Sequence, residues 1–230
     1  GPNQYLGPVI LAQRNRPVRV LFQNNLPTSD QAGSLLQIPN DTTYMGAGKG
    51  PDGTSYTENR AELHLHGGAS PWISDGTPHQ WITPANDPAS LKKGMSFANV
   101  PDMVGAGSPI GLTNPNDADG IGTYYWTNQQ SGRMMFYHDH SYGVTRLNVY
   151  AGEAAGYLLI DPAQETALRA ATVPGTIPAD ANGNMDLARA DLAHIVPLVI
   201  QDRTFIDPNG IATQDPTWRW GSVPGTAANG

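Results

Sequence analysis

The chain has 230 residues and a net charge of −7, with Gly and Pro contributing 26 and 20 residues and Cys none. The negative charge and the lack of a basic run argue against a nucleic-acid surface, and no apolar stretch approaches the roughly 18 residues of a membrane span. Without cysteine there are no disulfides, thiolate zinc sites, cysteine nucleophiles or cysteine-ligated iron–sulfur clusters, so any metal chemistry relies mainly on histidine and carboxylates.

The first half of the chain predicts two strands separated by long loops. Residues 16–27, "RPVRVLFQNNLP", alternate apolar and polar side chains and then reach a turn, which is typical of a half-buried strand. Residues 61–68, "AELHLHGG", predict a second strand that two glycines end. Residues 70–122 are rich in Pro, Gly, Asn and Asp and show little periodicity, which predicts loops, with "SDGTP" at 74–78 as a turn.

The second half of the sequence predicts further strands, and its composition changes after Pro162. Residues 123–128 and 133–140 are typical of two strands joined by "QQSG", and a short helical turn precedes a further strand at 154–161. The pattern indicates an antiparallel β-sandwich or barrel.

Three segments follow from these patterns. We expect residues 1–163 to form the first domain and residues 164–193 to form a linker. A short helix predicted at 163–171 begins at the boundary between them. Residues 194–230, opening on an apolar strand, begin a second, incomplete domain.

Four of the six histidines form two His-x-His pairs, His64 with His66 and His138 with His140. Residues i and i+2 of a strand point to the same face, about 6–7 Å apart, so each pair presents two imidazoles side by side. Imidazole suits zinc, copper, iron and nickel. Two such strands brought together provide four nitrogen ligands, for one ion or for part of a cluster. Spacing alone leaves open a zinc site that activates water, a polynuclear copper site that reduces dioxygen, and two unrelated pairs satisfied by local hydrogen bonds.

The residues around the pairs narrow this choice. "HLHGG", "SDGTP" and "FYHDHSYGVTRLNVYAGEAAGYLLIDP" resemble the multicopper oxidases, in particular the bacterial laccase-like branch of spore-coat laccases, bilirubin oxidases and phenoxazinone synthases. Residues 5–27 are similar to the opening of that family's first domain, and residues 193–210 to the start of its second. The resemblance implies an all-β, cupredoxin-like Greek-key β-sandwich, and it identifies the chain as an N-terminal portion of such an oxidase.

The resemblance also implies roles for individual residues. His64 would bind the type 2 copper, His66 and His138 one copper of the type 3 pair, and His140 the other. These are four of the eight histidines around a trinuclear copper cluster, and the family's third domain supplies the remaining four. Asp75, in "SDG", matches an acidic residue near the cluster, where a carboxylate could deliver protons. A turn-forming Asp before Gly is the simpler alternative.

The family oxidises its substrate at a type 1 copper, which needs a cysteine that this chain does not contain. We therefore expect activity only together with the C-terminal portion of the same oxidase, whether a second chain or the other product of a cleavage. The other expected partners are dioxygen and a small reducing substrate: a phenol, an aromatic amine, a bilirubin-like pigment or a metal ion. The resemblance favours a secreted, periplasmic or spore-coat location. A mononuclear zinc hydrolase or hydratase and a non-catalytic cupredoxin-fold module remain as alternatives.

The unpaired histidines carry weaker signals. His79 follows a turn in a polar loop, which predicts solvent exposure, and His194 opens an apolar segment as a structural or linker residue. The aromatic residues near the pairs are interpreted as core and loop packing: Trp72, Trp81, Tyr125, Trp126, Phe136 and Tyr137.

Overall fold

The computed structural model describes residues 5–36, 38–105, 107–108 and 111–203. The strands in these ranges are β1 Ile10–Gln13, β2 Val18–Gln23, β3 His64–His66, β4 Ile121–Trp126, β5 Arg133–His138 and β6 Ala154–Ile160. The α-helices are α1 Thr145–Ala151 and α2 Pro162–Ala170, and the 3₁₀ turns are η1 Trp72–Ser74, η2 Pro101–Met103 and η3 Leu192–His194. No helix in the described ranges is long and apolar enough to cross a membrane.

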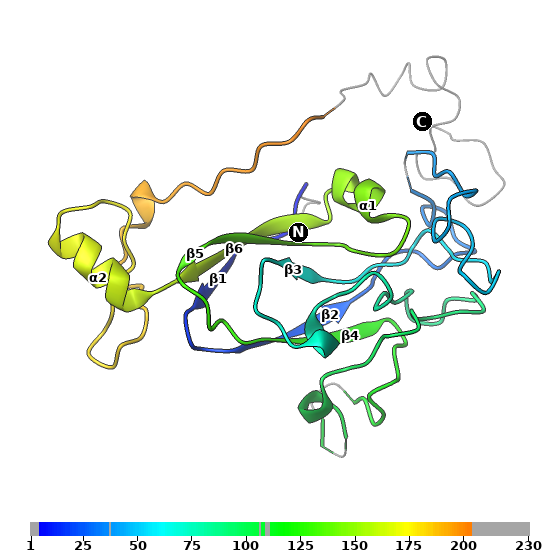
Figure 1. The fold of residues 1–230 in the computed structure, drawn as a ribbon, viewed down its shortest axis with the longest axis horizontal. Coiled ribbons are helices and arrows are strands. Elements are labelled where there is room, and N and C mark those ends of the chain that lie inside the picture. The colour runs from blue at the N-terminus through cyan, green and yellow to red at the C-terminus, as the bar shows by residue number, and fades with distance from the viewer. Residues whose placement is uncertain (1–4, 37, 106, 109–110, 204–230) are drawn as a thin grey trace.

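The strands form two sheets, one of four strands in the order β1-β6-β5-β3 and one made of β2 and β4 (Figure 1). All neighbours are antiparallel except β1 and β6, which run parallel with Ile10 opposite Tyr157. The antiparallel pairing expected from the sequence is thus found for the other neighbours and not for this pair. The two predicted strands around "QQSG" exist, but β4 and β5 belong to different sheets, so the turn carries the chain from one layer to the other.

The core lies between the two sheets. Val18, Val20 and Phe22 of β2 point inward while the residues between them are exposed, as the alternation predicted. They pack against buried residues from β1 and β3–β6: Ala12, Leu65, Tyr124, Trp126, Met135, Tyr137, Ala155, Tyr157 and Leu159. Burial of these aromatic and aliphatic side chains is the main stabilising term of the sandwich. The all-β, cupredoxin-like class predicted from the sequence is confirmed.

The segment between β2 and β4 is mostly loop, as predicted. It contains β3, two 3₁₀ turns and a few isolated bridges. Buried side chains take over the hydrogen bonding that ladders provide elsewhere: Asn24 donates to the carbonyls of Asn59 and Ile82, and the Asp87 carboxylate accepts from Ser29. Such bonds satisfy buried backbone groups where no strand does.

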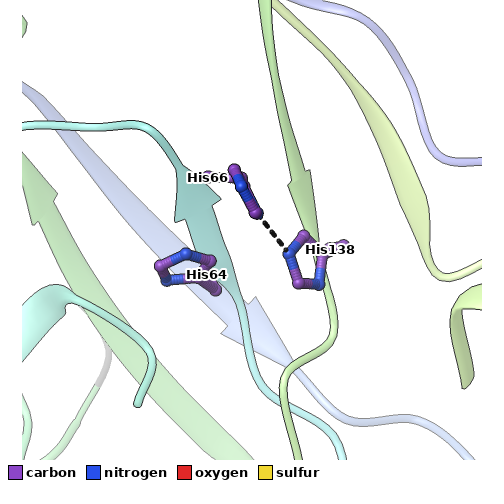
Figure 2. Close-up of side chains that lie close together, drawn as sticks. All are labelled: His64, His66 and His138. Carbon is purple, nitrogen blue, oxygen red and sulfur yellow. Dashed lines mark hydrogen bonds between the residues drawn. The ribbon is translucent and has the colours of Figure 1, made fainter. Parts of the chain in front are cut away.

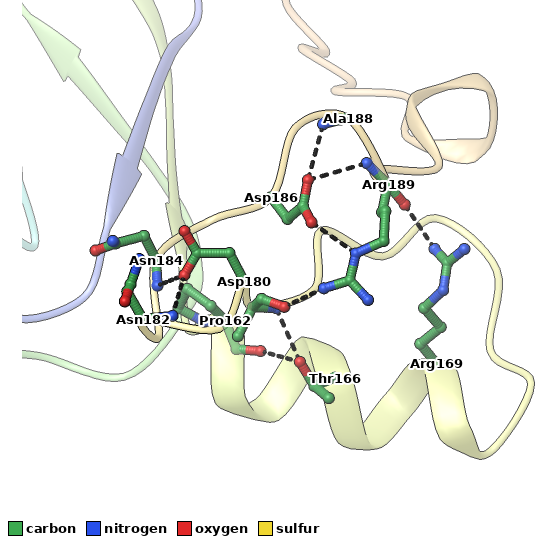
Figure 3. Close-up of polar contacts among 10 residues, drawn as sticks. Pro162, Thr166, Arg169, Asp180, Asn182, Asn184, Asp186, Ala188 and Arg189 are labelled. Carbon is green, nitrogen blue, oxygen red and sulfur yellow. Dashed lines mark hydrogen bonds and ion pairs between the residues drawn. The ribbon is translucent and has the colours of Figure 1, made fainter.

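Helix α2 forms where the sequence predicted a short helix. Asp161 caps its first turn by accepting from the amides of Ala163 and Gln164, and Pro162 occupies the first helical position, both of which favour helix initiation. The chain then returns beside α2 in a loop held by polar contacts (Figure 3). There Arg189 pairs with Asp186 and also donates to a backbone carbonyl of the same loop.

Residues 195–203 do not form the apolar strand that the sequence predicted, and residues 204–207 of that prediction lie outside the described ranges. The segment runs extended (Figure 1) with Val196, Leu198 and Ile200 exposed by 71%, 75% and 92%. It has no neighbouring strand in the described chain to complete a ladder, and a single extended segment is not stable as a sheet. Arg203 anchors its end between the rings of Tyr5 and Tyr150. The domain boundaries proposed above stay a prediction.

Candidate metal centre

Strand pairing brings the two His-x-His motifs together. β3 and β5 are antiparallel neighbours, with His64 directly opposite His138 and His66 opposite Phe136. Opposed residues on one face of an antiparallel pair have their Cβ atoms about 4.5–5.5 Å apart. The rings of His64, His66 and His138 accordingly converge over one end of the sheet (Figure 2).

The ring spacings define one compact cluster. The His64 centroid lies 5.5 Å from that of His66, 5.3 Å from His138 and 5.0 Å from His140. One ring nitrogen from each of His64, His66 and His138 lies within 4.8 Å of the others. His140 lies two residues beyond His138, just past the end of β5, and its ring lies 5.5 Å from that of His138. All four predicted histidines are therefore gathered at one place.

A tight turn holds His64. Its Nδ1 lies 2.6 Å from the backbone carbonyl oxygen of Asp75, and donation to that oxygen leaves Nε2 free as a ligand. The turn comes this close because Gly76 has φ of 68°, and a Cβ on it would lie 2.0 Å from the carbonyl oxygen of Leu63. The structure thus gives Asp75 a role that the sequence did not predict, through its carbonyl. The proton-delivery role of its carboxylate stays a prediction.

His138 is held in the same manner. Its Nδ1 donates to the carbonyl of Asp139, so its Nε2 carries the lone pair. The Nδ1 of His66 lies 3.1 Å from this Nε2 and donates to it. Burial lowers the pKa of His138 below its usual value, with a smaller contribution from the neighbouring histidines, which favours the neutral imidazole that metals bind.

The remaining two rings have fewer constraints. His66 is exposed and stacks on Phe136, with 4.6 Å between centroids and 16° between planes. Phe136, interpreted from sequence as packing, is half exposed and stacks on His138 as well. The Nδ1 of His140 is buried and has no hydrogen-bond partner in the described chain. A buried polar atom without a partner is costly, so this nitrogen suits a group that the chain does not itself supply.

The donor set fits copper. The four side chains are imidazoles without a cysteine or a carboxylate among them, and imidazole is a good ligand for copper and zinc alike. Two rings are fixed by backbone carbonyls, as is usual for metal-binding histidines. The geometry indicates a metal centre and does not by itself select the metal.

Comparison with known proteins selects the family. The chain is 30% identical over 199 residues to a laccase of Bacillus subtilis, covering 86% of this chain and 28% of that protein. It is 33% identical over 162 residues to multicopper oxidase LPR1 homolog 1 of Oryza sativa, covering 70% of this chain and 22% of that protein. The chain belongs to the multicopper oxidase family. The resemblance to its laccase-like branch is confirmed, since a bilirubin oxidase of Albifimbria verrucaria also matches, at 30% identity over 45% of this chain and 12% of that protein.

Other comparisons add less. No protein-family model matches the chain. A solved laccase-like multicopper oxidase from Ochrobactrum sp. overlaps 75% of this chain and 23% of its own chain at 17% identity, with a TM-score of 0.41, which is too loose to support a conclusion. This multicopper oxidase chain spans about a quarter of the length of the curated relatives that it matches, for example 28% of the Bacillus laccase.

Sequence reasoning missed three buried charged residues beside the cluster of this multicopper oxidase chain. Arg60, Glu62 and Asp139 are almost fully buried. Burial raises the pKa of Glu62 well above its usual range and raises that of Asp139, and it lowers the pKa of Arg60 to about 10. The only sign of these residues in the sequence is a charged letter inside "NRAELHLH" or between the histidines of "HDH". The spacing of apolar residues does not reveal that such a charged residue is buried.

The unpaired histidines are not among the residues of the cluster. His79 is half buried, with its ring 4.8 Å from that of Tyr142, so its predicted solvent exposure was wrong because the Tyr142 ring packs against it. His194 is exposed in η3 beside the Asp191 carboxylate. Trp72 is exposed rather than packed, whereas Trp81 and Trp126 are fully buried as predicted.

Proposed function

We propose that the four histidines bind copper and form half of the trinuclear centre at which a laccase-like multicopper oxidase reduces dioxygen to water. The observation that carries this proposal is the convergence of His64, His66, His138 and His140 in a chain of this family. By position, His64 serves the type 2 copper, His66 and His138 one type 3 copper, and His140 the other. The chain is then an N-terminal portion of the oxidase.

Copper supplies the one-electron redox chemistry that four-electron reduction of dioxygen requires. This chain's own residues bind and orient. The Asp75 and Asp139 carbonyls fix the tautomers of His64 and His138, so that each presents Nε2 toward the cluster. Phe136 covers one side of His66. The Asp75 carboxylate is our candidate for delivering protons, four of which are consumed with four electrons for each dioxygen that becomes two waters.

The other half of the centre lies in the rest of the oxidase. The electrons come from a reducing substrate at a type 1 copper, whose cysteine this chain does not contain. Phenols and aromatic amines are the proposed substrates, with metal ions as a further class. We propose that the C-terminal portion supplies four more histidines to the exposed side of the cluster, the side on which His66 lies.

Replacement of two ligands in the complete oxidase tests this proposal. We expect His138→Ala/His140→Ala to lose at least half of the bound copper, measured by elemental mass spectrometry, and to lower oxygen consumption at least about 100-fold. His194→Ala, at an exposed histidine outside the cluster, is the matched control and should change neither. Unchanged oxygen uptake in the double variant would rule out the role, and one zinc without copper in the wild type would favour the hydrolase or hydratase instead.

A further inference from the structure

The residue between the two histidines of "HDH" is itself part of the architecture. Asp139 is 1% exposed, and the hydrogen bonds described for its carboxylate join it to Glu62, Ser141 and Asn148, not to the histidine rings that flank it in the chain. Its backbone amide donates to the carbonyl of Glu153, just before β6. Asp139 therefore lies at the end of the β5–β6 pairing, between the two histidines.

The Asp139 carboxylate accepts four hydrogen bonds. Its Oδ1 accepts from the backbone amide of Glu62 at 3.0 Å and from the Ser141 hydroxyl at 2.6 Å. Its Oδ2 accepts from the backbone amide of Ser141 and from the Asn148 side-chain amide, both at 3.0 Å. Glu62 lies two residues before His64, and Ser141 directly follows His140. One side chain thus joins the two histidine-bearing segments and helix α1.

These contacts require a carboxylate. The two backbone amides can only donate, and the Asn148 amide is fixed as a donor because the same nitrogen also donates to the carbonyl of Arg60. An asparagine at position 139 would direct its own NH₂ toward at least one of these donors. Asp139→Asn therefore keeps the volume of the side chain but loses part of its hydrogen-bond arrangement.

We infer that Asp139 is a positioning residue for the metal centre: it sets the spacing and angle between the segment that carries His64 and the segment that carries His138 and His140. This inference rests on the proposed function, since the centre it shapes is the proposed copper site. Asp139 is assigned no proton-transfer or ligand role, because its carboxylate is bonded to Glu62, Ser141 and Asn148. Its effect on the metal passes through the histidines alone.

The chain contains a matched control. Asp87 is also 1% exposed, and its carboxylate also accepts from two backbone amides, one serine hydroxyl and one asparagine amide. The donors are the amides of Ser29 and Ala89, the Ser29 hydroxyl and the Asn59 side chain. Asp87 lies in the loop segment between β3 and β4, and none of these four donors lies within two residues of a cluster histidine. Asp87→Asn therefore removes the same kind of stability without touching the cluster.

The test compares Asp139→Asn, Asp87→Asn and Ser141→Ala in the complete oxidase. It measures the melting temperature without copper, the copper atoms per molecule, and the electron paramagnetic resonance spectrum of the bound copper. We expect both aspartate variants to melt at lower temperature. Of the two aspartate variants, only Asp139→Asn should lose half or more of its copper or shift the copper spectrum. Ser141→Ala should shift that spectrum in the same direction by less.

Three results would overturn the inference. The first is an Asp139→Asn variant with wild-type copper content and spectrum, and the second an equal spectral change in Asp87→Asn. If Asp139→Asn does not fold, an unchanged spectrum in Ser141→Ala is the third. Should the wild type take up no copper, the proposed function fails instead. A crystal structure of metal-free Asp139→Asn then decides the inference. A distance between the His64 and His138 ring centroids unchanged from 5.3 Å contradicts it, and a longer distance supports it.

Discussion

Two regions of this chain are held together in different ways. Around the histidines, β3, β5 and β6 exchange ladder hydrogen bonds, and the site forms where this ladder ends. Between β2 and β4, apart from β3, the described chain has almost no ladder and depends on buried side chains that bond to backbone groups. Strand pairing positions residues by register, whereas the loop region needs a separate polar side chain for each turn that it fixes.

The same arrangement, a buried carboxylate that accepts four hydrogen bonds, nevertheless occurs in both regions. Asp87 and Asp139 each have one oxygen bonded to a backbone amide and a serine hydroxyl, and the other to a backbone amide and an asparagine side chain. In the loop region, the bonded carboxylate of Asp87 holds loop segments that carry none of the cluster histidines. At the end of the ladder, the bonded carboxylate of Asp139 fixes the histidines. The role of such a buried, fully bonded aspartate therefore depends on which segments carry its donors.

The largest effect is expected where the two regions are joined. The buried Arg60 donates to the carbonyls of Gly46 and Thr57 in the loops and of Tyr142 just after the histidines. Arg60→Ala leaves three carbonyls unsatisfied and a cavity between two aromatic rings. We expect the free energy of unfolding to fall by about 3–5 kcal/mol, measured by urea denaturation.

Two further variants sharpen the Arg60 result. Arg60→Lys keeps the positive charge but lacks the planar guanidinium group. We therefore expect its free energy of unfolding to lie between those of the wild type and Arg60→Ala. Arg133, an exposed arginine that bonds only locally to Ser131, provides the control. Arg133→Ala should change stability by less than about 0.5 kcal/mol. Equal losses in Arg60→Ala and Arg133→Ala would show that Arg60 does not join the regions.

An intermediate effect is expected at the turn that holds His64. Gly76→Ala imposes a left-handed backbone on alanine and drives its Cβ against the carbonyl of Leu63, at a cost of about 2–4 kcal/mol. Gly53 has a similar φ of 80° and no neighbour within 4 Å of its would-be Cβ. Gly53→Ala should therefore cost only about 1 kcal/mol. Denaturation curves that coincide for the two variants would contradict the close packing of the turn.

The smallest expected effect, at Glu153, is a gain rather than a loss of stability. Burial, with a smaller contribution from Asp139, raises the pKa of Glu153 well above its reference value of 4.5. Above that pH the unfolded chain ionises Glu153 more readily than the folded chain does, so ionisation favours unfolding. Glu153→Gln should then raise the free energy of unfolding at pH 7 to 8 by on the order of 1 kcal/mol. The gain should shrink as the pH falls toward 4.5, and a gain independent of pH would contradict this origin.

Sequence alone predicted what depends on local patterns. Alternation placed β2, composition placed α2, and the His-x-His spacing with its surroundings named all four cluster residues. It did not predict the parallel pairing of β1 and β6, which joins residues far apart in the chain. Nor could it predict that the Asp75 carbonyl holds His64, because a backbone atom has no letter in the sequence. The apolar run at 195–203 was misjudged because a strand needs a neighbour, which no periodicity supplies.

The tautomers of the histidines determine how the site fills. His64 and His138 already point a lone pair at the cluster, since each gives its Nδ1 proton to a backbone carbonyl. His66 does not, because its Nδ1 proton lies on the bond to His138. A metal ion bound by both rings would need that proton moved to the far nitrogen of His66, because a protonated ring nitrogen cannot be a ligand. His66 is the most exposed ring of the three, so water can reach this proton.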